Sequence, residues 1–204
     1  HYLQHEVERI APLFDPGREV RQLHLGGGTP NFLDPPRMEI LMTMLARHFP
    51  FARQAVRELG IEVDPRFADR AYIEGLAQLG FNRLSLGIQD FDPAVQQAIN
   101  RVHGVAQTRA VMQAAHDDEF ASINVDLIYG LPLQTTASME HTLDEVIKLQ
   151  PDRIALYGYA HLPDTFKAQR QIDARELPGS TERRAMFGQA LGRLSAAGYV
   201  FIGM

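Results

Sequence analysis

The sequence predicts an α/β fold arranged as an incomplete TIM-type (β/α) barrel. Three observations predict it. Strand-like and helix-like segments alternate along the whole sequence, helical segments separate consecutive strands, and glycine or polar residues follow the strands. Strands joined in this way form right-handed βαβ units and a parallel sheet. Five or six units in one run favour a barrel, and a doubly wound sheet is the alternative.

The expected helices and strands follow from the spacing of apolar residues. Helical spacing predicts helices over residues 3–14, 37–49, 69–79, 94–100, 105–117, 138–149 and 181–197. Short apolar or alternating runs predict strands over residues 23–25, 61–63, 82–87, 123–129 and 153–159, and residues 199–202 are also strand-like. Pro35 and Pro36 precede the second helix, and Gly80 stops the third.

The periodicity is weakest between about Pro163 and Thr181, where residues 162–172 read as irregular or helical. We therefore divide the chain into a partial barrel core, residues 1–162, and residues 163–204, which end the barrel and begin a connection to a further domain. Because His1 falls within a predicted helix and Met204 within a motif, we expect a fragment that is truncated at both ends.

The composition excludes several classes of protein. Hydrophobic residues make up 45% and charged residues 22% of the 204 positions, as in an ordinary soluble domain. No apolar run approaches a membrane span, no targeting pattern opens the sequence, and no basic block suggests nucleic acid, so we expect a cytoplasmic protein. The sequence has no cysteine, and its eight histidines form no metal-binding spacing, so we predict no metal ligand in it.

Residues suited to ligand binding follow each predicted strand. In parallel α/β folds, sites gather at the carboxyl ends of the strands. The residues at those ends are Gly26 to Pro30, Glu62 with Asp64, Gln89 with Asp90, Asp126, and Ala160 with His161. The sequence thus predicts a binding or catalytic site at the mouth of the barrel.

The run Gly26-Gly27-Gly28 lets a backbone approach a ligand closely and adopt positive φ. It is neither a phosphate-binding Walker loop nor a dinucleotide-binding GxGxxG loop. A tight turn between a strand and a helix is the alternative interpretation.

Two carboxylates stand on otherwise apolar strands, Glu62 and Asp126. A carboxylate in a barrel mouth needs a partner, and an ammonium group or a ribose diol of a bound ligand would serve. The alternative is a structural ion pair with Arg57, Arg66 or Arg83.

Three other polar side chains are candidates. Gln89 can orient a polar ligand, or it can cap the following helix. Arg101 can clamp a carboxylate, or it can stabilise the dipole of the helix that it follows. His161 is the one histidine at a strand end that we consider for the site.

An ordered set of motifs resembles the oxygen-independent coproporphyrinogen III oxidase family of radical S-adenosylmethionine (SAM) enzymes. The motifs are LHLGGGTP (23–30), EVDPR (62–66), GFNRLS (80–85), GIQDF (87–91), NVDLIYGLP (124–132), YAHLP (159–163) and FIGM (201–204). They run almost end to end and stand in family order. The resemblance implies a TIM-type barrel of the radical SAM kind.

The resemblance also implies site residues for two molecules of S-adenosyl-L-methionine. Gly27 and Glu62 match contacts to the molecule that touches a [4Fe–4S] cluster. Contacts to the second molecule are matched by Gly28, Thr29, Gln89, Arg101, Asp126 and Ala160.

The implied reaction belongs to heme and porphyrin biosynthesis. A 5′-deoxyadenosyl radical starts the oxidative decarboxylation of two propionates of coproporphyrinogen III, which gives protoporphyrinogen IX. The partners are this substrate, an electron donor for the cluster and an electron acceptor, and we expect a monomer. The candidate cations for the propionates are Arg153, Lys167 and Arg170.

Several departures qualify the resemblance. The Cys-x3-Cys-x2-Cys loop that holds the cluster is expected before His1, and a C-terminal domain after Met204, so the chain alone should be inactive. Residues 51–60 are longer than expected before the acidic strand, and residues 117–120 replace a small-residue turn.

Two other functions stay open. A heme chaperone related to the oxidases is favoured by residues 102–104 (VHG), whereas residues 89–91 (QDF) and 159–163 favour the oxidase. A TIM-barrel lyase with Glu62 and Asp126 as acid and base is more distant.

Overall fold

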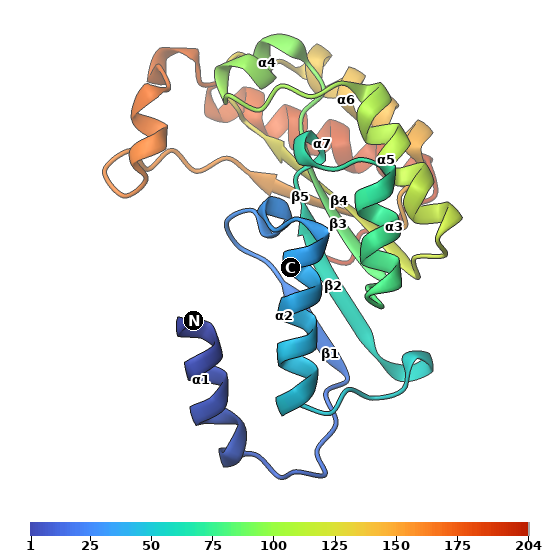
Figure 1. The fold of residues 1–204 in the computed structure, drawn as a ribbon. Coiled ribbons are helices and arrows are strands. Elements are labelled where there is room, and N and C mark those ends of the chain that lie inside the picture. The colour runs from blue at the N-terminus through green and yellow to red at the C-terminus, as the bar shows by residue number, and fades with distance from the viewer. Residues whose placement is uncertain (204) are drawn as a thin grey trace.

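A parallel sheet in chain order forms the centre of the molecule (Figure 1). The computed structural model describes residues 1–203. Within this range five strands pair in the order β1-β2-β3-β4-β5, each parallel to its neighbour. They are β1 (Gln22–Leu25), β2 (Glu58–Val63), β3 (Arg83–Gln89), β4 (Ser122–Tyr129) and β5 (Arg153–Gly158). Because the order never reverses, the sheet is part of a barrel and the doubly wound alternative is wrong.

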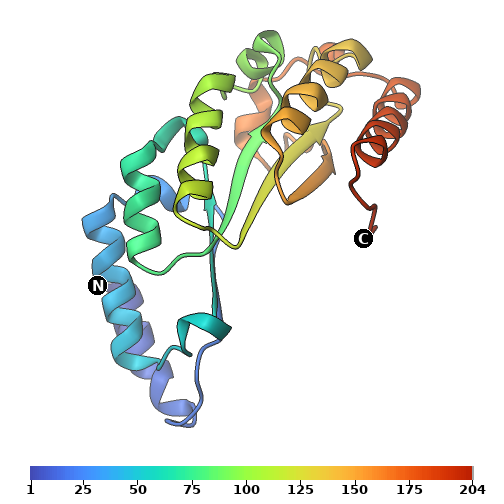
Figure 2. The same cartoon turned by 90° about the vertical axis from the view of Figure 1, so that its right-hand side faces the viewer.

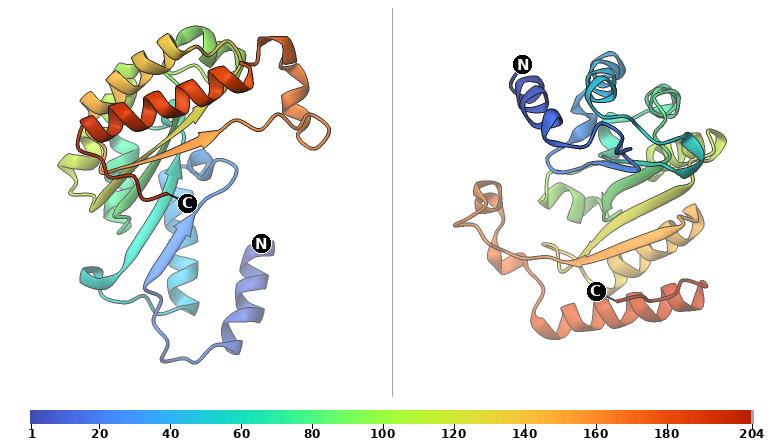
Figure 3. Two further views of the ribbon diagram at one scale, coloured as in Figure 1. Left: turned by 180° about the vertical axis from the view of Figure 1, so that it is seen from behind. Right: turned by 90° about the horizontal axis from the view of Figure 1, so that it is seen from below.

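The helices lie on the convex side of the curved sheet, and the concave side faces an open space (Figures 2 and 3). They are α1 (Tyr2–Ile10), α2 (Pro35–His48), α3 (Arg70–Gln78), α4 (Pro93–Ala98), α5 (Val105–Asp117), α6 (Thr136–Leu149) and α7 (Ser180–Ala196). No helix within residues 1–203 is long and apolar enough to cross a membrane.

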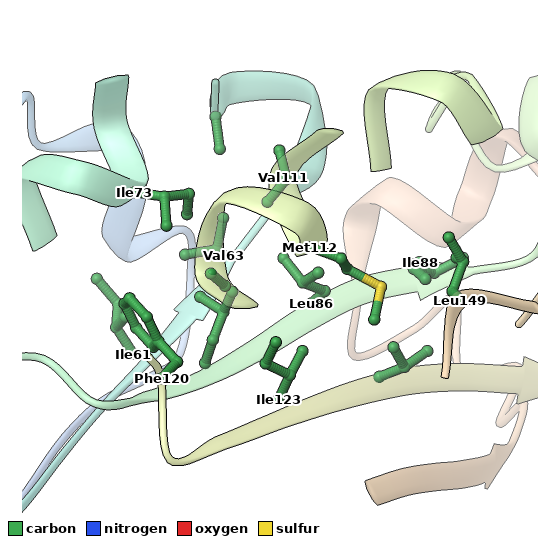
Figure 4. Packing of buried hydrophobic residues seen from close by; sticks show 14 of the residues in the cluster. Ile61, Val63, Ile73, Leu86, Ile88, Val111, Met112, Phe120, Ile123 and Leu149 are labelled. Carbon is green, nitrogen blue, oxygen red and sulfur yellow. The ribbon is translucent and has the colours of Figure 1, made fainter. Parts of the chain in front are cut away.

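Side chains alternate along each strand, and the alternation separates an apolar face from a polar one. The apolar face lies under the helices, where Ile61, Leu86 and Ile123 are almost completely buried. Ile73 of α3 and Met112 of α5 pack onto it (Figure 4). Each such buried side chain contributes about 1.5–3 kcal/mol of transfer free energy.

The concave face is polar instead. It surrounds an open cavity of about 510 Å³, whose lining includes Gln22, His24, Glu58, Arg83, Ser85, Asn124, Arg153 and Tyr157. These residues alternate with the buried apolar ones, so the core of the protein lies between sheet and helices and the barrel interior is left for polar groups.

Polar residues at the first positions of the helices explain where the helices begin. Asp34 accepts a hydrogen bond from the backbone N–H of Arg37, and Asp69 accepts one from Tyr72. Asp92 accepts from two backbone N–H groups of α4, and Thr135 forms a capping box with Ser138. A side-chain cap of this kind is worth about 1 kcal/mol.

Most expected elements are found, and two expectations need correction. β2 begins at Glu58 rather than residue 61, because Glu58 and Gly60 alternate with buried Leu59 and pair with β1. The longer segment at residues 51–60 is thus partly strand. Residues 199–202 form no strand: Tyr199 bonds to Leu194 and Pro151, and Ile202 is 85% exposed.

Expectations near the C-terminus are tested in part. Residues 162–172 contain a short 3₁₀-helix, Lys167–Gln171, in agreement with an irregular or helical segment. Met204 of the motif at residues 201–204 lies outside the described residues. The division of the chain between residues 162 and 163 stays a prediction.

Candidate functional site

Most of the candidate residues gather at the carboxyl ends of the strands, on the concave face. In the pairing of β2 with β3, Glu62 lies beside Ser85. In the pairing of β3 with β4, Gly87 lies beside Asp126. A side chain on Gly87 would meet the Gln89 amide at 2.9 Å and Arg101 at 3.6 Å. Gln89, Arg101 and Asp126 therefore converge above Gly87, with Glu62 on the neighbouring strand.

The glycine loop after β1 is anchored by Glu62. The backbone N–H of Gly27 donates to Glu62 Oε2 at 3.0 Å, and His24 Nε2 lies 3.3 Å from Glu62 Oε1. A Cβ on Gly26 would lie 2.7 Å from Glu62 Oε1, so glycine at this position keeps the carboxylate in place.

The next two glycines shape an open backbone. Gly27 and Gly28 have φ of 76° and 65°, values that favour glycine, and a Cβ on either would meet nothing within 4 Å. The loop is thus a tight turn whose outer surface is accessible to a ligand. Thr29 follows, half-buried, and its carbonyl accepts from the N–H of Phe32.

The ion pair considered for Glu62 is not formed. Arg66 bonds Asp64 and Arg83 bonds Glu58, whereas the partners of Glu62 are His24 and Gly27. The carboxylate of Glu62 is 45% exposed and faces the barrel interior.

Gln89 occupies an unusual backbone position at the end of β3. Its φ is 67°, and the N–H of Asp90 donates to the carbonyl of Ile88 at 2.8 Å, which makes Gln89 the centre of a turn of the rare classic γ type. A non-glycine residue in such a sparsely populated region costs about 1–3 kcal/mol. The capping role considered for Gln89 is wrong, because Asp92 caps the following helix.

Arg101 is held by a buried carboxylate. Its Nη2 donates to Asp64 Oδ2 at 2.8 Å, and Arg66 donates to the same carboxylate. Burial alone would raise the pKa of Asp64, but hydrogen bonds from the two guanidinium groups outweigh it and hold that pKa well below its ordinary value. Arg101 thus serves this carboxylate rather than the end of α4.

Asp126 lies on β4 within a small polar network. Ser85 Oγ donates to it at 2.9 Å, and Asn124 Nδ2 does so at 2.9 Å. Burial raises the pKa of Asp126, and the negative charge of Glu62 adds to the rise while the two hydrogen bonds oppose it. No arginine pairs with Asp126 among residues 1–203, so the ion-pair alternative is wrong here too.

Ala160 and His161 lie in a separate turn after β5. The carbonyl of Ala160 accepts from Gln169 Nε2 at 3.0 Å, and that of Tyr159 accepts from Arg183 Nη2 at 2.7 Å. His161 Nδ1 lies 3.4 Å from the Tyr159 hydroxyl. In the described part of the chain no hydrogen bond joins this turn to Gln89, Arg101 or Asp126.

The three candidate cations for the substrate are dispersed. Arg153 lines the cavity near the amino end of β5. Lys167 and Arg170 lie exposed on the 3₁₀-helix, where Arg170 donates to the carbonyl of Pro163.

Sequence reasoning missed several residues of this region. Ser85 and Asn124 support Asp126, and Tyr157 points to the same interior, where burial and then Asp126 and Glu62 raise its pKa. The alternation of side chains along a strand could have identified them, because residues separated by an even number of positions point to the same face of the sheet. Each of the three is related in this way to a predicted site residue on its own strand or on the paired strand.

The arrangement suits a ligand that carries several kinds of polar group. Two carboxylates can bind an ammonium or ribose hydroxyls, a guanidinium can bind a carboxylate, and the open glycine backbone admits close contact. No group of three His, Asp or Glu side chains within residues 1–203 is placed to hold a metal ion.

Comparisons with known proteins identify relatives of this chain. The Radical SAM superfamily model matches residues 1–146. An oxygen-independent coproporphyrinogen III oxidase of Pseudomonas aeruginosa is 46% identical over 202 residues, 99% of this chain and 44% of the relative. That of Synechocystis is 43% identical over 199 residues, 98% of this chain and 42% of the relative.

A solved structure is similar over the same range. The coproporphyrinogen III oxidase from Escherichia coli, described as a radical SAM enzyme, superposes with a TM-score of 0.95 at 43% identity. The match covers 99% of this chain and 46% of that chain, so the chain spans less than half the length of these proteins.

Proposed function

The chain belongs to the radical SAM superfamily, and we propose that it forms the central part of an oxygen-independent coproporphyrinogen III oxidase. The complete enzyme would convert coproporphyrinogen III to protoporphyrinogen IX by oxidative decarboxylation of two propionates. Identity of 43–46% over nearly the whole chain supports this function. The observation in the structure that carries it is the convergence of Gln89, Arg101 and Asp126 above Gly87.

The residues present fit S-adenosylmethionine, whose polar groups are an ammonium, a carboxylate and a ribose. We assign the first molecule to Gly27 and Glu62, where an open backbone and a half-exposed carboxylate lie 3.0 Å apart. Glu62 Oε2 would exchange its bond to Gly27 for one to the ligand, and the freed N–H could then donate to the ligand.

We assign a second molecule to Gly28, Thr29, Gln89, Arg101, Asp126 and Ala160. Arg101 would bind the methionyl carboxylate with the N–H groups that Asp64 does not use, and Asp126 would bind the ribose hydroxyls or the ammonium. The amide of Gln89 would fix the orientation of the ligand between them. Ala160 would approach from the turn after β5.

The chain does not fit an iron–sulfur cluster, because it contains no cysteine. We therefore assign no cluster ligand and derive no step through the cluster from these residues. In this superfamily S-adenosylmethionine bound beside such a cluster supplies radical hydrogen abstraction. The task of this chain is to bind and orient the adenosyl groups and to shield them from water.

The partners proposed are coproporphyrinogen III, an electron donor and an electron acceptor, and the protein is proposed to be monomeric. The open polar cavity of about 510 Å³ supports binding of a polar substrate group, with Arg153 at its wall. The related proteins named above are oxidases, which favours the oxidase over a heme chaperone.

The decisive experiment uses the complete polypeptide in which this sequence occurs. After anaerobic reconstitution with iron and sulfide, it is incubated with coproporphyrinogen III, S-adenosylmethionine and dithionite, and the porphyrins are separated by chromatography. We expect protoporphyrinogen IX, and a loss of product in Asp126→Asn. Stoichiometric uptake of heme without any product would instead identify a chaperone.

A further inference from the structure

Two peptide groups close to Gln89, the one that precedes it and the one that follows Asp90, are held by buried side chains that no proposed ligand contact requires. His103 Nε2 lies 2.9 Å from the carbonyl of Ile88, and Gln96 Nε2 donates to the carbonyl of Asp90 at 2.8 Å. His103 and Gln96 are 7% and 3% exposed. The strained turn at Gln89 is thus held by one side-chain hydrogen bond before it, from His103, and by another after it, from Gln96. We call these two hydrogen bonds the braces.

The two braces are joined to each other. Gln96 accepts the backbone N–H of His103 through its Oε1 at 3.1 Å while its Nε2 reaches Asp90. Since a carbonyl can only accept, Nε2 of His103 must carry the proton, and Nδ1 then accepts from the buried hydroxyl of Thr108 at 3.3 Å. Phe91 packs edge-on against the imidazole with ring centres 5.7 Å apart, which fixes the plane of the ring.

The side chain of Asp90, the residue after Gln89, also holds the turn in place. The carboxylate of Asp90 is completely buried and accepts from Gln134 at 2.6 Å, from Thr142 at 2.9 Å and from the N–H of Asp92 at 2.6 Å. The Thr142 hydroxyl also accepts the N–H of Phe91. The contacts from Gln134 and Thr142 come from the loop before α6 and from α6, so the turn is fixed to segments distant in sequence.

A backbone position that costs free energy persists only when its surroundings over-determine it, and such positions concentrate at functional sites. Here the strain falls on the residue whose amide stands over Gly87 beside Arg101. An extended Gln89 would stay on the concave face, but its Cα would lie roughly 7 Å beyond that of Gly87. The turn is what folds the amide back over Gly87. The braces therefore have a consequence for the site as well as for the fold.

We propose that His103, acting with Gln96, is a positioning residue: it holds Gln89 in the γ-turn so that the glutamine amide reaches the ligand bound by Arg101 and Asp126. His103 touches no ligand itself. This inference rests on the proposed function for the identity of that ligand, S-adenosylmethionine, whereas the bracing of the turn is independent of it.

The bracing is tested by hydrogen exchange in the complete polypeptide, followed for the Asp90 amide, which closes the turn. His103→Leu removes the donor at similar volume, and His103→Gln places an amide N–H near the position of Nε2. We expect the exchange to be about tenfold faster in His103→Leu and near wild type in His103→Gln. Ile73→Val, a core change in α3 away from the turn, is the control for lost stability. Equal exchange in wild type and His103→Leu would overturn the proposal.

The link to the ligand is tested by titration with S-adenosylmethionine in a double-mutant cycle. We expect His103→Leu to weaken one of the two binding events about tenfold, and to have no further effect when Gln89 is already alanine. Additive losses, or equal losses at both sites, would show that His103 acts only through stability. If the wild type binds no S-adenosylmethionine, the proposed function fails, and hydrogen exchange still decides the bracing.

Discussion

Arg101 donates to Asp64 at 2.8 Å, so the cation of the candidate site is placed by an anion whose side chain is only 3% exposed. Asp64 follows β2 and is held in place by two further contacts. Its backbone N–H donates to the side chain of Asn31, and its carboxylate also accepts from Arg66. The position of Arg101 is therefore determined by a neighbouring strand end rather than by its own segment. This relationship leads to the first two predictions.

Asp64→Asn should lower the free energy of unfolding by about 2–3 kcal/mol, because two guanidinium groups lose the charge that holds them. Urea unfolding measures the change. Glu74→Gln is the control, since it removes one partner of an exposed pair with Arg70 and should cost less than about 0.5 kcal/mol. A loss in Asp64→Asn as small as in the control would contradict the role of Asp64.

The same pair predicts a pH dependence of stability. The pKa of Asp64 is lower in the folded protein than the value of 3.8 expected for the unfolded chain. The stabilisation is thus fully present above about pH 5 and is lost as the pH falls towards the folded-state pKa. The difference in unfolding free energy between wild type and Asp64→Asn should be constant from pH 5 to 7 and shrink below pH 4. A difference that grew on acidification would have the wrong sign.

Gly26→Ala should mainly weaken ligand binding, whereas Gly27→Ala should mainly lower the free energy of unfolding. A methyl on Gly26 would push against Glu62 and His24, so we expect weaker S-adenosylmethionine binding with little change in stability. A methyl on Gly27 meets no atom but must adopt φ of 76°, which should cost about 1–2 kcal/mol of stability. Calorimetric titration and thermal unfolding of both variants separate the two effects. The prediction is wrong if Gly26→Ala loses as much stability as Gly27→Ala.

Gln89→Asn should separate binding from stability. Asparagine should be no more strained than glutamine at this positive φ, so the free energy of unfolding should stay about equal. Its amide is one methylene shorter and should no longer reach the ligand, which predicts about tenfold weaker binding. Chemical unfolding and ligand titration give the two quantities, and a destabilised variant with normal affinity would be the opposite result.

Arg183→Met should loosen the turn that carries Ala160. Arg183 reaches over Gly130, where a Cβ would lie 2.8 Å from its Nε, and donates to the carbonyl of Tyr159. Without this bond, hydrogen exchange in the peptide covering residues 159–166 should become severalfold faster. Arg175→Met, which removes an arginine from an exposed local pair with Asp173, should leave that peptide unchanged. Unaltered exchange in Arg183→Met would show that Arg183 does not hold the turn.

The sequence predicted the helices and strands well because their signals are local. Apolar spacing placed α5 at residues 105–117, as found, and Asp126 was marked as a carboxylate on an otherwise apolar strand. Glu58 to Gly60 were missed as strand, since their polar positions face the barrel interior and read as a loop. The strand predicted at residues 199–202 was wrong, because an apolar run forms a strand only where a neighbouring strand is available for pairing.

The candidate site was predicted less completely, for a physical reason. Nothing local to Arg101 indicates Asp64, and nothing near Gln89 indicates His103 or Thr142, because these contacts join segments more than ten residues apart. The alternatives for Glu62, Asp126 and Gln89 could be decided only from distances. Sequence patterns identify which residues stand at strand ends, whereas the buried partners that orient them require the folded chain.

The polar side chains that line the concave face alternate with the buried apolar side chains of the convex face on the same five strands. Exchanging a residue on the concave face removes no contact from the layer between sheet and helices. Substitutions of Arg153 or Tyr157 would therefore change which groups the cavity can bind while the layer between sheet and helices stays packed. The chemistry of the concave face can in this way change at little cost to the folding stability of the sheet.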